Sequence, residues 1–565
     1  MSSRPLPSTS DEAMALTWPD FQEQYADLAE QELTQENLGD WLARWSNLHS
    51  LLDEVEQKLY VVTTLNTADK AAQDRLMEFM KTIHEPRQVE EEKLRQKLIT
   101  SGLSTPTMAV AIRQMKANSD LFREENLPLQ TSLVEMGNEY DGLCGARSIV
   151  WDGEEITLEK ATQILEEGDR DRREKAWRLK HERILEDRAP FNALWTKMFD
   201  TRREIARNAG KDSYMDYIWQ SYHRFDYSPD DCATFRNAIL TEVVPAAREV
   251  YEERRRSMEL SSLRPWDLDV DLFGSKPLSP FDGEAELNGK SQAIFDEMDP
   301  ALGDYYRDMV DNGRMDLFSR KNKANGGYCM TYSHIRKPFI FMNAVGTHDN
   351  LQTLLHEAGH AFHAYEAAKL DYVFEANVGS EFCEVASMGM EMLSHPYFTK
   401  FYSESDAARA RIQHLEKQLL FWPYMAVIDG FQSWAYQNPE EGRNPAACDA
   451  EWGRLWDEYM PGIDYSGLDD IKVTGWHRKL HIFHIPFYYV EYGLAQVGAL
   501  QVWMNSKKDP AGALAAYRRG LSLGSTVGLP QLFEAAGGKF SFDAGTLREL
   551  VGAIMGELSD QRAKI

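Results

Sequence analysis

The spacing of apolar residues along this chain predicts mostly α-helix. Between residues 18 and 101, apolar side chains recur every three or four positions, which is the period of one helix face. A further helical run covers residues 67–81, and residues 90–97 carry charges of both signs. We expect an exposed helix face there, with intrahelical pairs such as Glu91–Arg95. The clearest apolar stripe consists of Trp41, Leu42, Trp45, Leu48, Leu51 and Leu52.

The helical pattern weakens in the middle of the chain. A break falls at residues 258–290, around several prolines. Residues 327–343, with the sequence GYCMTYSHIRKPFIFMN, are rich in aromatic and β-branched residues and predict strands. Pro338 indicates a strand start or a sheet edge, because proline cannot donate to a strand ladder. From residue 349 to the end the pattern is helical again, so we expect a mainly α fold with a small β-sheet.

Composition and charge exclude several classes of protein. The formal charge of −28 argues against binding to nucleic acid or to anionic membranes. Residues 1–15 are small, polar and proline-bearing, so we expect them to be disordered. They contain no apolar stretch of signal-peptide length, and no run of about 18 apolar residues predicts a membrane span. Five scattered cysteines without a C-x-x-C pair indicate free thiols in a reducing compartment. The expected location is therefore the cytoplasm.

The most informative motif is HEAGH at residues 356–360. Residues four apart lie on one face of a helix, so His356 and His360 can bind the same metal ion. Glu357 beside them can reach a water molecule on that ion. Gly359 costs a helix about 1 kcal/mol relative to alanine. We therefore expect another group, such as a substrate or a strand, to approach the helix closely at this glycine.

A catalytic zinc site needs a third protein ligand and an open fourth position. One class of zinc peptidase extends the motif to H-E-x-x-H-x-x-G-x-x-H, but His363 and Glu366 stand where that class has glycine and histidine. The helical segment EFCEVASMGMEML offers Glu381, Glu384 and Glu391 instead. We favour Glu384, because its distance from the motif leaves room for a loop and a returning helix.

The segment WHRKLHIFHIPFYYVEYG is the second concentration of candidate chemistry. His477, His481 and His484 follow the spacing of one helix face, and tyrosines follow at 488, 489 and 492. Three interpretations remain open here: a second metal site, an aromatic helix packed in the core, and a cleft wall that donates hydrogen bonds to an oxyanion.

Residues 520–524 match G-x-S-x-G, the serine nucleophile motif, which requires a strand before it and a helix after it. Here a helical pattern runs up to Arg519, and Gly520 is typical of a helix C-cap. The sequence therefore does not predict a serine nucleophile.

Several separated motifs in the same order resemble the zinc oligopeptidase family that contains thimet oligopeptidase and oligoendopeptidase F, nearest to its oligoendopeptidase F and Pz-peptidase branch. The resemblance implies a mainly α, zincin-like metallopeptidase with two lobes around a deep channel. It leads us to expect an N-terminal helical lobe at 16–190 and a zinc metallopeptidase catalytic domain at 191–565. The matching segments are RREIARNAGKDSYMDY (202–217), RPWD (264–267), GGYCMTYS (326–333), KPFIFMNAVGT (337–347), TLLHEAGHAFH (353–363), FCEVASMGME (382–391), HIFHIPFYYVEYGLAQVGALQVW (481–503) and YRRGLSLGST (517–526).

The resemblance also implies roles for individual residues. It assigns one zinc ion to His356, His360 and Glu384, in agreement with the spacing argument, and the general base to Glu357. The zinc would polarise the scissile carbonyl and lower the pKa of its water.

The family further uses a histidine and tyrosines near the C-terminus to bind substrate and stabilise the oxyanion. These map best onto His481, Tyr489 and Tyr492, with Tyr488 and His484 as alternatives. The strand region at 327–343 resembles the family's substrate-binding edge.

The expected function is hydrolysis of internal bonds in short unfolded peptides, with these peptides as substrates and with neither nucleic acid nor a membrane as partner. A zinc exopeptidase and a non-catalytic helical binding protein remain as alternatives. Cobalt or manganese could replace zinc in vitro.

Overall fold

The computed structural model describes residues 5–274 and 276–565, and these form two compact units. Unit 1 contains Met1–Asp120, Ser279–Tyr402 and Gly498–Phe540; unit 2 contains Leu121–Leu278, Ser403–Val497 and Ser541–Ile565. Each unit is thus assembled from three separate stretches of the chain.

Unit 1 combines helices with a small sheet. Its helices are α1 (Ser10–Ala13), α2 (Trp18–Glu30), α3 (Leu38–Leu65), α4 (Lys70–Phe79), α5 (Glu85–Ser101), α6 (Ala109–Leu121), α14 (Glu284–Met298), α15 (Pro300–Asp311), α16 (His348–Ala367), α17 (Ser380–Leu393), α24 (Pro510–Leu521) and α25 (Leu529–Ala535). Its strands are β3 (Met315–Phe318), β4 (Tyr328–Tyr332) and β5 (Lys337–Ala344).

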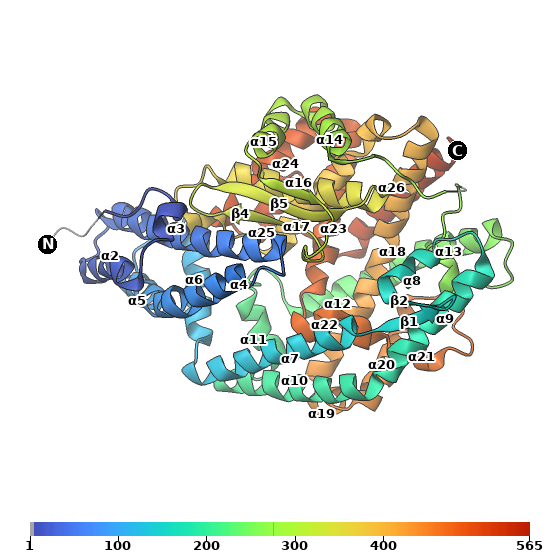
Figure 1. Ribbon diagram of the computed structural model, residues 1–565, viewed down its shortest axis with the longest axis horizontal. Helices are drawn as coiled ribbons and strands as arrows, with labels where there is room; N and C mark the ends of the chain where they lie inside the picture. The colour runs from blue at the N-terminus through green and yellow to red at the C-terminus, as the bar shows by residue number, and fades with distance from the viewer. Residues whose placement is uncertain (1–4, 275) are drawn as a thin grey trace. The chain divides into compact units, whose positions relative to one another are not determined.

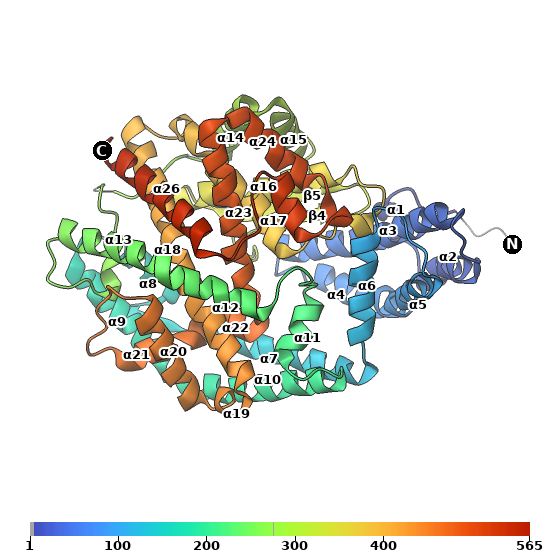
Figure 2. The same ribbon diagram turned by 180° about the vertical axis from the view of Figure 1, so that it is seen from behind.

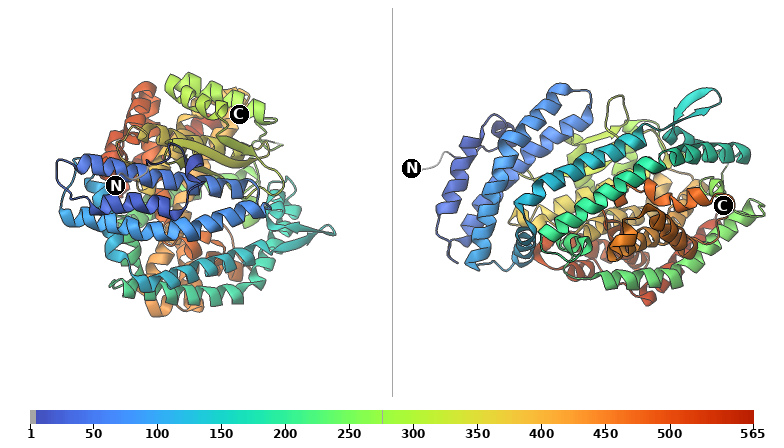
Figure 3. Two further views of the ribbon diagram at one scale, coloured as in Figure 1. Left: turned by 60° about the vertical axis from the view of Figure 1, so that its left-hand side comes forward. Right: turned by 90° about the horizontal axis from the view of Figure 1, so that it is seen from below.

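In its described residues, unit 2 is helical apart from one hairpin. Its helices are α7 (Leu127–Gly145), α8 (Leu158–Ile164), α9 (Arg170–Glu186), α10 (Arg188–Asn208), α11 (Tyr214–Ser221), α12 (Pro229–Ala238), α13 (Val244–Ser257), α18 (Glu404–Gln437), α19 (Pro439–Gly442), α20 (Pro445–Tyr459), α21 (Asp469–Val473), α22 (Leu480–His484) and α26 (Ala544–Arg562). The first half of α23 (Tyr489–Lys508) also belongs to it. Its hairpin strands are β1 (Ser148–Trp151) and β2 (Glu154–Thr157), drawn as teal arrows in Figure 3.

The N-terminal helices of unit 1 confirm the predicted apolar stripe. All six of its residues lie on α3 and are almost completely buried. The prediction that residues 1–15 are disordered is wrong for part of that range, because Ser10–Ala13 form α1. The Ser10 hydroxyl donates to buried Glu54, which fixes this turn against α3. Residues 1–4 lie outside the described part of the chain.

The charged stretch on α5 differs from its prediction. Glu91 is buried and accepts hydrogen bonds from the Tyr25 hydroxyl at 2.6 Å and the Trp45 indole at 2.8 Å. Arg95 pairs with Glu92 instead. Helix spacing alone does not show which of several neighbouring glutamates turns inward, because that depends on the polar groups of the packed helices.

The sheet of unit 1 has the order β3-β5-β4, with β3 parallel and β4 antiparallel to β5. Pro338 is the second residue of β5, which confirms the predicted strand start. Helix α16 packs against β5 (Figure 1), so the sheet supports one side of this helix.

The core of unit 2 forms around α18, which packs against α20 and α26 (Figure 2). Trp195, Trp452 and Trp476 are each fully buried in this unit and surround Phe431 of α18. The mainly α fold with small sheets is therefore confirmed. The lobe boundary at residue 190 and the deep channel stay predictions.

Candidate metal centre and active site

Helix α16 carries the HEAGH motif, and its start is well defined. Thr347 is the N-cap, and its hydroxyl accepts from the backbone N–H of Asn350, which satisfies one free donor of the first turn. The motif lies near the middle of the helix. The predicted apolar face, namely Leu351, Leu354, Leu355, Ala358, Ala361 and Phe362, is fully buried.

At Gly359 the backbone of α17 comes close to α16. A Cβ atom at this position would lie 2.4 Å from the Ala386 carbonyl oxygen and 2.7 Å from the Ser387 Cα. The expectation of close approach is confirmed, but the neighbour is a helix backbone and not a strand or a substrate. This contact brings Glu384, two residues before Ala386 on the same helix, next to the two histidines.

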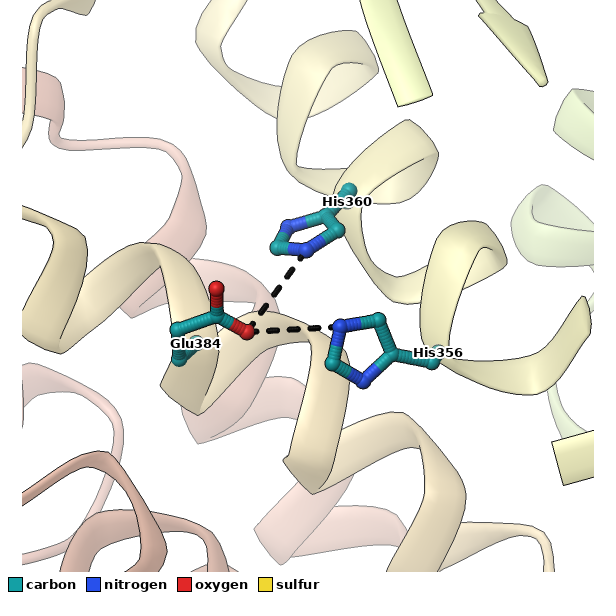
Figure 4. A group of neighbouring side chains, drawn as sticks. All are labelled: His356, His360 and Glu384. Carbon is teal, nitrogen blue, oxygen red and sulfur yellow. Dashed lines mark ion pairs between the residues drawn. The ribbon is translucent and has the colours of Figure 1, made fainter. Parts of the chain in front are cut away.

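The three predicted ligands converge from these two helices (Figure 4). Glu384 Oε2 lies 3.3 Å from His356 Nε2 and 3.7 Å from His360 Nε2, and the three ligand atoms are within 4.8 Å of one another. A tetrahedral zinc ion with bonds of about 2.0–2.1 Å places its ligand atoms about 3.3 Å apart. Two imidazoles and one carboxylate at this spacing fit a zinc ion. Glu381 does not belong to the group.

Two further side chains orient these ligands. Glu391 Oε1 lies 2.7 Å from His356 Nδ1, so the ring holds its proton there and leaves Nε2 free for a metal. The Ser387 hydroxyl donates to Glu384 Oε2 at 2.8 Å. The sequence offered Glu391 as a possible zinc ligand. In the structure it instead orients the ligand His356. Ser387 was not predicted; its position one turn after Glu384 on the same face is the only signal in the sequence.

Glu357 has the environment of a general base. Its side chain is 6% exposed, and its Oε2 atom has no hydrogen-bond partner in the described part of the chain. Burial, together with the charges of Glu384 and Glu391, raises its pKa to about 7, although His356 opposes the shift. Its other oxygen would lie 3.6 Å, an ordinary van der Waals distance, from a Cβ atom built on Gly327, the residue before β4.

The three C-terminal histidines do not share one helix. His477 lies in a short 3₁₀ turn, Gly475–Arg478, and contacts Asn192 at 2.9 Å. His484 ends α22 and contacts Asp141 at 3.1 Å. Among the described residues, the only group suited to a metal is the one on α16 and α17.

His481 is placed differently from these two histidines. Its Nδ1 atom is buried without a hydrogen-bond partner among the described residues, and burial lowers its pKa to about 4. The ring is therefore neutral at neutral pH. Its centroid lies 4.8 Å from that of Tyr489, 6.0 Å from Tyr492 and 6.2 Å from Tyr488. Unit 2 thus brings His481 and all three candidate tyrosines together, while their catalytic role stays a prediction.

The G-x-S-x-G stretch is not a nucleophile elbow. Gly520 lies inside α24, which runs to Leu521, and Ser522 is its C-cap. The Ser522 hydroxyl donates back to the Arg519 carbonyl at 2.8 Å, as it does at an ordinary helix end.

Comparison with known proteins places this site in a family. A model of peptidase family M3 matches residues 163–552. The chain belongs to peptidase family M3. The resemblance inferred from the motifs is therefore confirmed, and the M3 match contains both the α16–α17 site and the His481 cluster.

Individual relatives agree with the M3 family assignment. An oligoendopeptidase F homologue from Borreliella burgdorferi is 23% identical over 316 residues, covering 52% of this chain and 50% of the relative. An oligoendopeptidase F homologue from Mycoplasma pneumoniae is 24% identical over 288 residues, which cover 48% of this chain and 46% of the relative. The chain thus spans about half the length of the curated relatives it matches.

A solved structure of Pz peptidase A with an inhibitor has a TM-score of 0.86 and 26% identity. The likeness covers 99% of this chain and 98% of that one, so the shared fold includes the N-terminal helices that the M3 model leaves unmatched.

No helix among the described residues is both long and apolar enough to cross a membrane.

Proposed function

We propose that this chain is a zinc-dependent oligoendopeptidase that hydrolyses internal bonds of short, unfolded peptides. The observation that carries the proposal is the convergence of His356, His360 and Glu384 beside the unpartnered carboxylate of Glu357. Membership of peptidase family M3 supports peptides as the substrate class. Bound zinc would supply Lewis acidity toward the carbonyl of the scissile bond.

Glu357 is the proton carrier of the proposed reaction. Its carboxylate accepts a proton from the attacking water and delivers it to the leaving amine. A base works best when its pKa lies near the working pH, and burial already brings the pKa of Glu357 to about 7. The two histidines bind as neutral imidazoles, with His356 held in the required tautomer by Glu391.

His481, Tyr489 and Tyr492 donate hydrogen bonds to the oxyanion in this proposal. Burial raises the pKa of the Tyr489 hydroxyl, so this group keeps its proton over the whole physiological range. A preorganised donor of this kind contributes about 100- to 1,000-fold in rate. Strand β4 lies at the edge of its sheet, and an extended peptide can add to that edge by backbone hydrogen bonds.

We place the activity in the cytoplasm, in keeping with free cysteines scattered along the chain.

The proposal is tested by Glu357→Gln. This variant should bind zinc as the wild type does, measured by metal analysis, and should lose at least about 100-fold in kcat/KM on quenched fluorescent peptides. Asp349→Asn, an acid-to-amide change on the exposed first turn of α16, is the matched control and should retain activity. Wild-type activity in Glu357→Gln would remove Glu357 as the base.

A second variant tests the metal site. Glu384→Ala should lose zinc, because two histidines alone leave the ion without its third protein ligand. Tight, stoichiometric zinc in this variant would contradict the ligand assignment.

A blocked peptide separates the endopeptidase from an exopeptidase. Mass spectrometry of the products should show internal cleavage of a peptide that is acetylated and amidated at its ends. An exopeptidase would leave that peptide intact.

A further inference from the structure

Lys479 lies beside the proposed oxyanion donors and lacks a counter-charge. It immediately precedes α22, two residues before His481, and its side chain is half-buried. Its ammonium lies 3.7 Å from the ring centroid of Tyr489 and 5.2 Å from that of Tyr424. Within the described part of the chain, it forms no ion pair and no hydrogen bond.

Of two neighbouring cations, one has a carboxylate partner and the other has none in the described part of the chain. Lys472, seven residues earlier, pairs with Asp457 at 2.9 Å. Arg478, directly before Lys479, also forms no ion pair among the residues described. Its positive charge acts on Tyr424, lowering a hydroxyl pKa that burial raises. Two consecutive cations thus face an aromatic group without an acidic partner, in a chain whose formal charge is −28.

An unpaired ammonium removed from water is costly, and this cost is visible at Lys479. Burial alone lowers its pKa to about 7, and no nearby carboxylate raises it again. Attraction to the Tyr489 ring offsets only part of that cost. A ligand that carries a carboxylate would supply the missing charge and raise the pKa of the lysine. Every unblocked peptide has such a group at its C-terminus.

We propose that Lys479 binds a carboxylate of the peptide substrate and thereby selects substrates that carry one. This inference rests on the proposed peptidase function and on contact of the substrate with His481 and Tyr489. It makes Lys479 a specificity-determining residue, which binds substrate without taking part in proton transfer.

The test compares three peptides with the same scissile bond: one with a free C-terminal carboxylate, one with a C-terminal amide, and one amide with a glutamate near that end. Wild type should cleave at least one carboxylate peptide about tenfold or more faster, in kcat/KM, than the plain amide. The peptide that is preferred identifies the α-carboxylate or the side-chain carboxylate as the ligand.

Lys479→Met retains the apolar stem and removes the charge. It should reduce kcat/KM for the preferred peptide by about 30-fold, mainly through KM, and reduce kcat/KM for the plain amide much less, because the amide offers no carboxylate to the lysine. Lys479→Arg should restore much of the preference. Lys472→Met removes a lysine that already has an acidic partner, and it should behave as wild type.

Equal cleavage of all three peptides by the wild type would overturn the inference while leaving the peptidase function intact. An equal loss on all three peptides in Lys479→Met would also overturn it, since a purely structural role predicts that pattern. No cleavage of any peptide by zinc-loaded wild type would instead contradict the proposed function. If Lys479→Met does not fold, inhibition of the wild type is measured with acetylated dipeptide acids and with their amides. Inhibition by the acids but not by the amides supports the inference. Equal inhibition by both contradicts it.

Discussion

Replacing Gly359 by alanine should displace a zinc ligand without touching the metal site directly. The new Cβ would lie 2.4 Å from the Ala386 carbonyl oxygen, whereas carbon–oxygen contacts of this kind need about 3.3 Å. The atoms in the way are backbone, so α17 must withdraw from α16 by about 1 Å. Glu384 moves with it, and zinc sites tolerate deviations of only about 0.2 Å in ligand distance.

The expected effect on stability is a balance of two terms. Overpacking costs about 1–3 kcal/mol, and the higher helix propensity of alanine returns about 1 kcal/mol. The metal-free variant should therefore lose at most about 2 kcal/mol in free energy of unfolding. Zinc affinity, measured by competition with a chromogenic chelator, should fall at least about tenfold, as it does when ligand orientation is lost.

Gly289→Ala is the matched control, because a Cβ at that position of α14 meets no atom within 4 Å. It should leave zinc affinity unchanged and stabilise the protein slightly. Zinc affinity of Gly359→Ala equal to that of wild type would refute the argument that this glycine sets the position of Glu384.

Three further predictions concern the partner of a zinc ligand, the serine of the G-x-S-x-G stretch and a histidine of unit 1. Glu391→Ala should weaken zinc binding about 10- to 100-fold by releasing His356 Nδ1; unchanged affinity in a chelator titration would contradict this. Ser522→Ala should retain full peptide hydrolysis, and inactivation would revive the serine hypothesis. For His49, burial lowers the pKa but the charges of Glu91 and Asp53 raise it to about 9, despite the opposing charge of Arg87. Its contribution is fully present below pH 6.5 and is lost as pH rises through about 9, so urea unfolding should show a decline between pH 7 and 10 that His49→Gln lacks.

The sequence predicted the parts of the site that depend on helix periodicity. His356 and His360 share a face because they are four apart, and Glu384 followed from the need for a third ligand on a returning helix. The buried stripe on α3 was predictable for the same reason.

Other features depend on contacts between elements distant in sequence, which periodicity does not encode. Glu391 and Glu384 lie on one helix, and only the packing of α17 against α16 decides which is the ligand and which orients His356. Likewise, the spacing of His477 and His484 in the sequence is compatible with a metal site. In the structure, however, His477 contacts Asn192 and His484 contacts Asp141, both on other helices.

The most direct test of the central claim is a zinc titration of the metal-stripped protein with a peptide blocked at both ends. We predict that hydrolysis is absent without metal, rises linearly with added zinc and saturates at one ion per chain, with products cut at an internal bond. Full hydrolysis by the metal-free protein, or saturation at any other stoichiometry, would contradict a single zinc ion held by His356, His360 and Glu384.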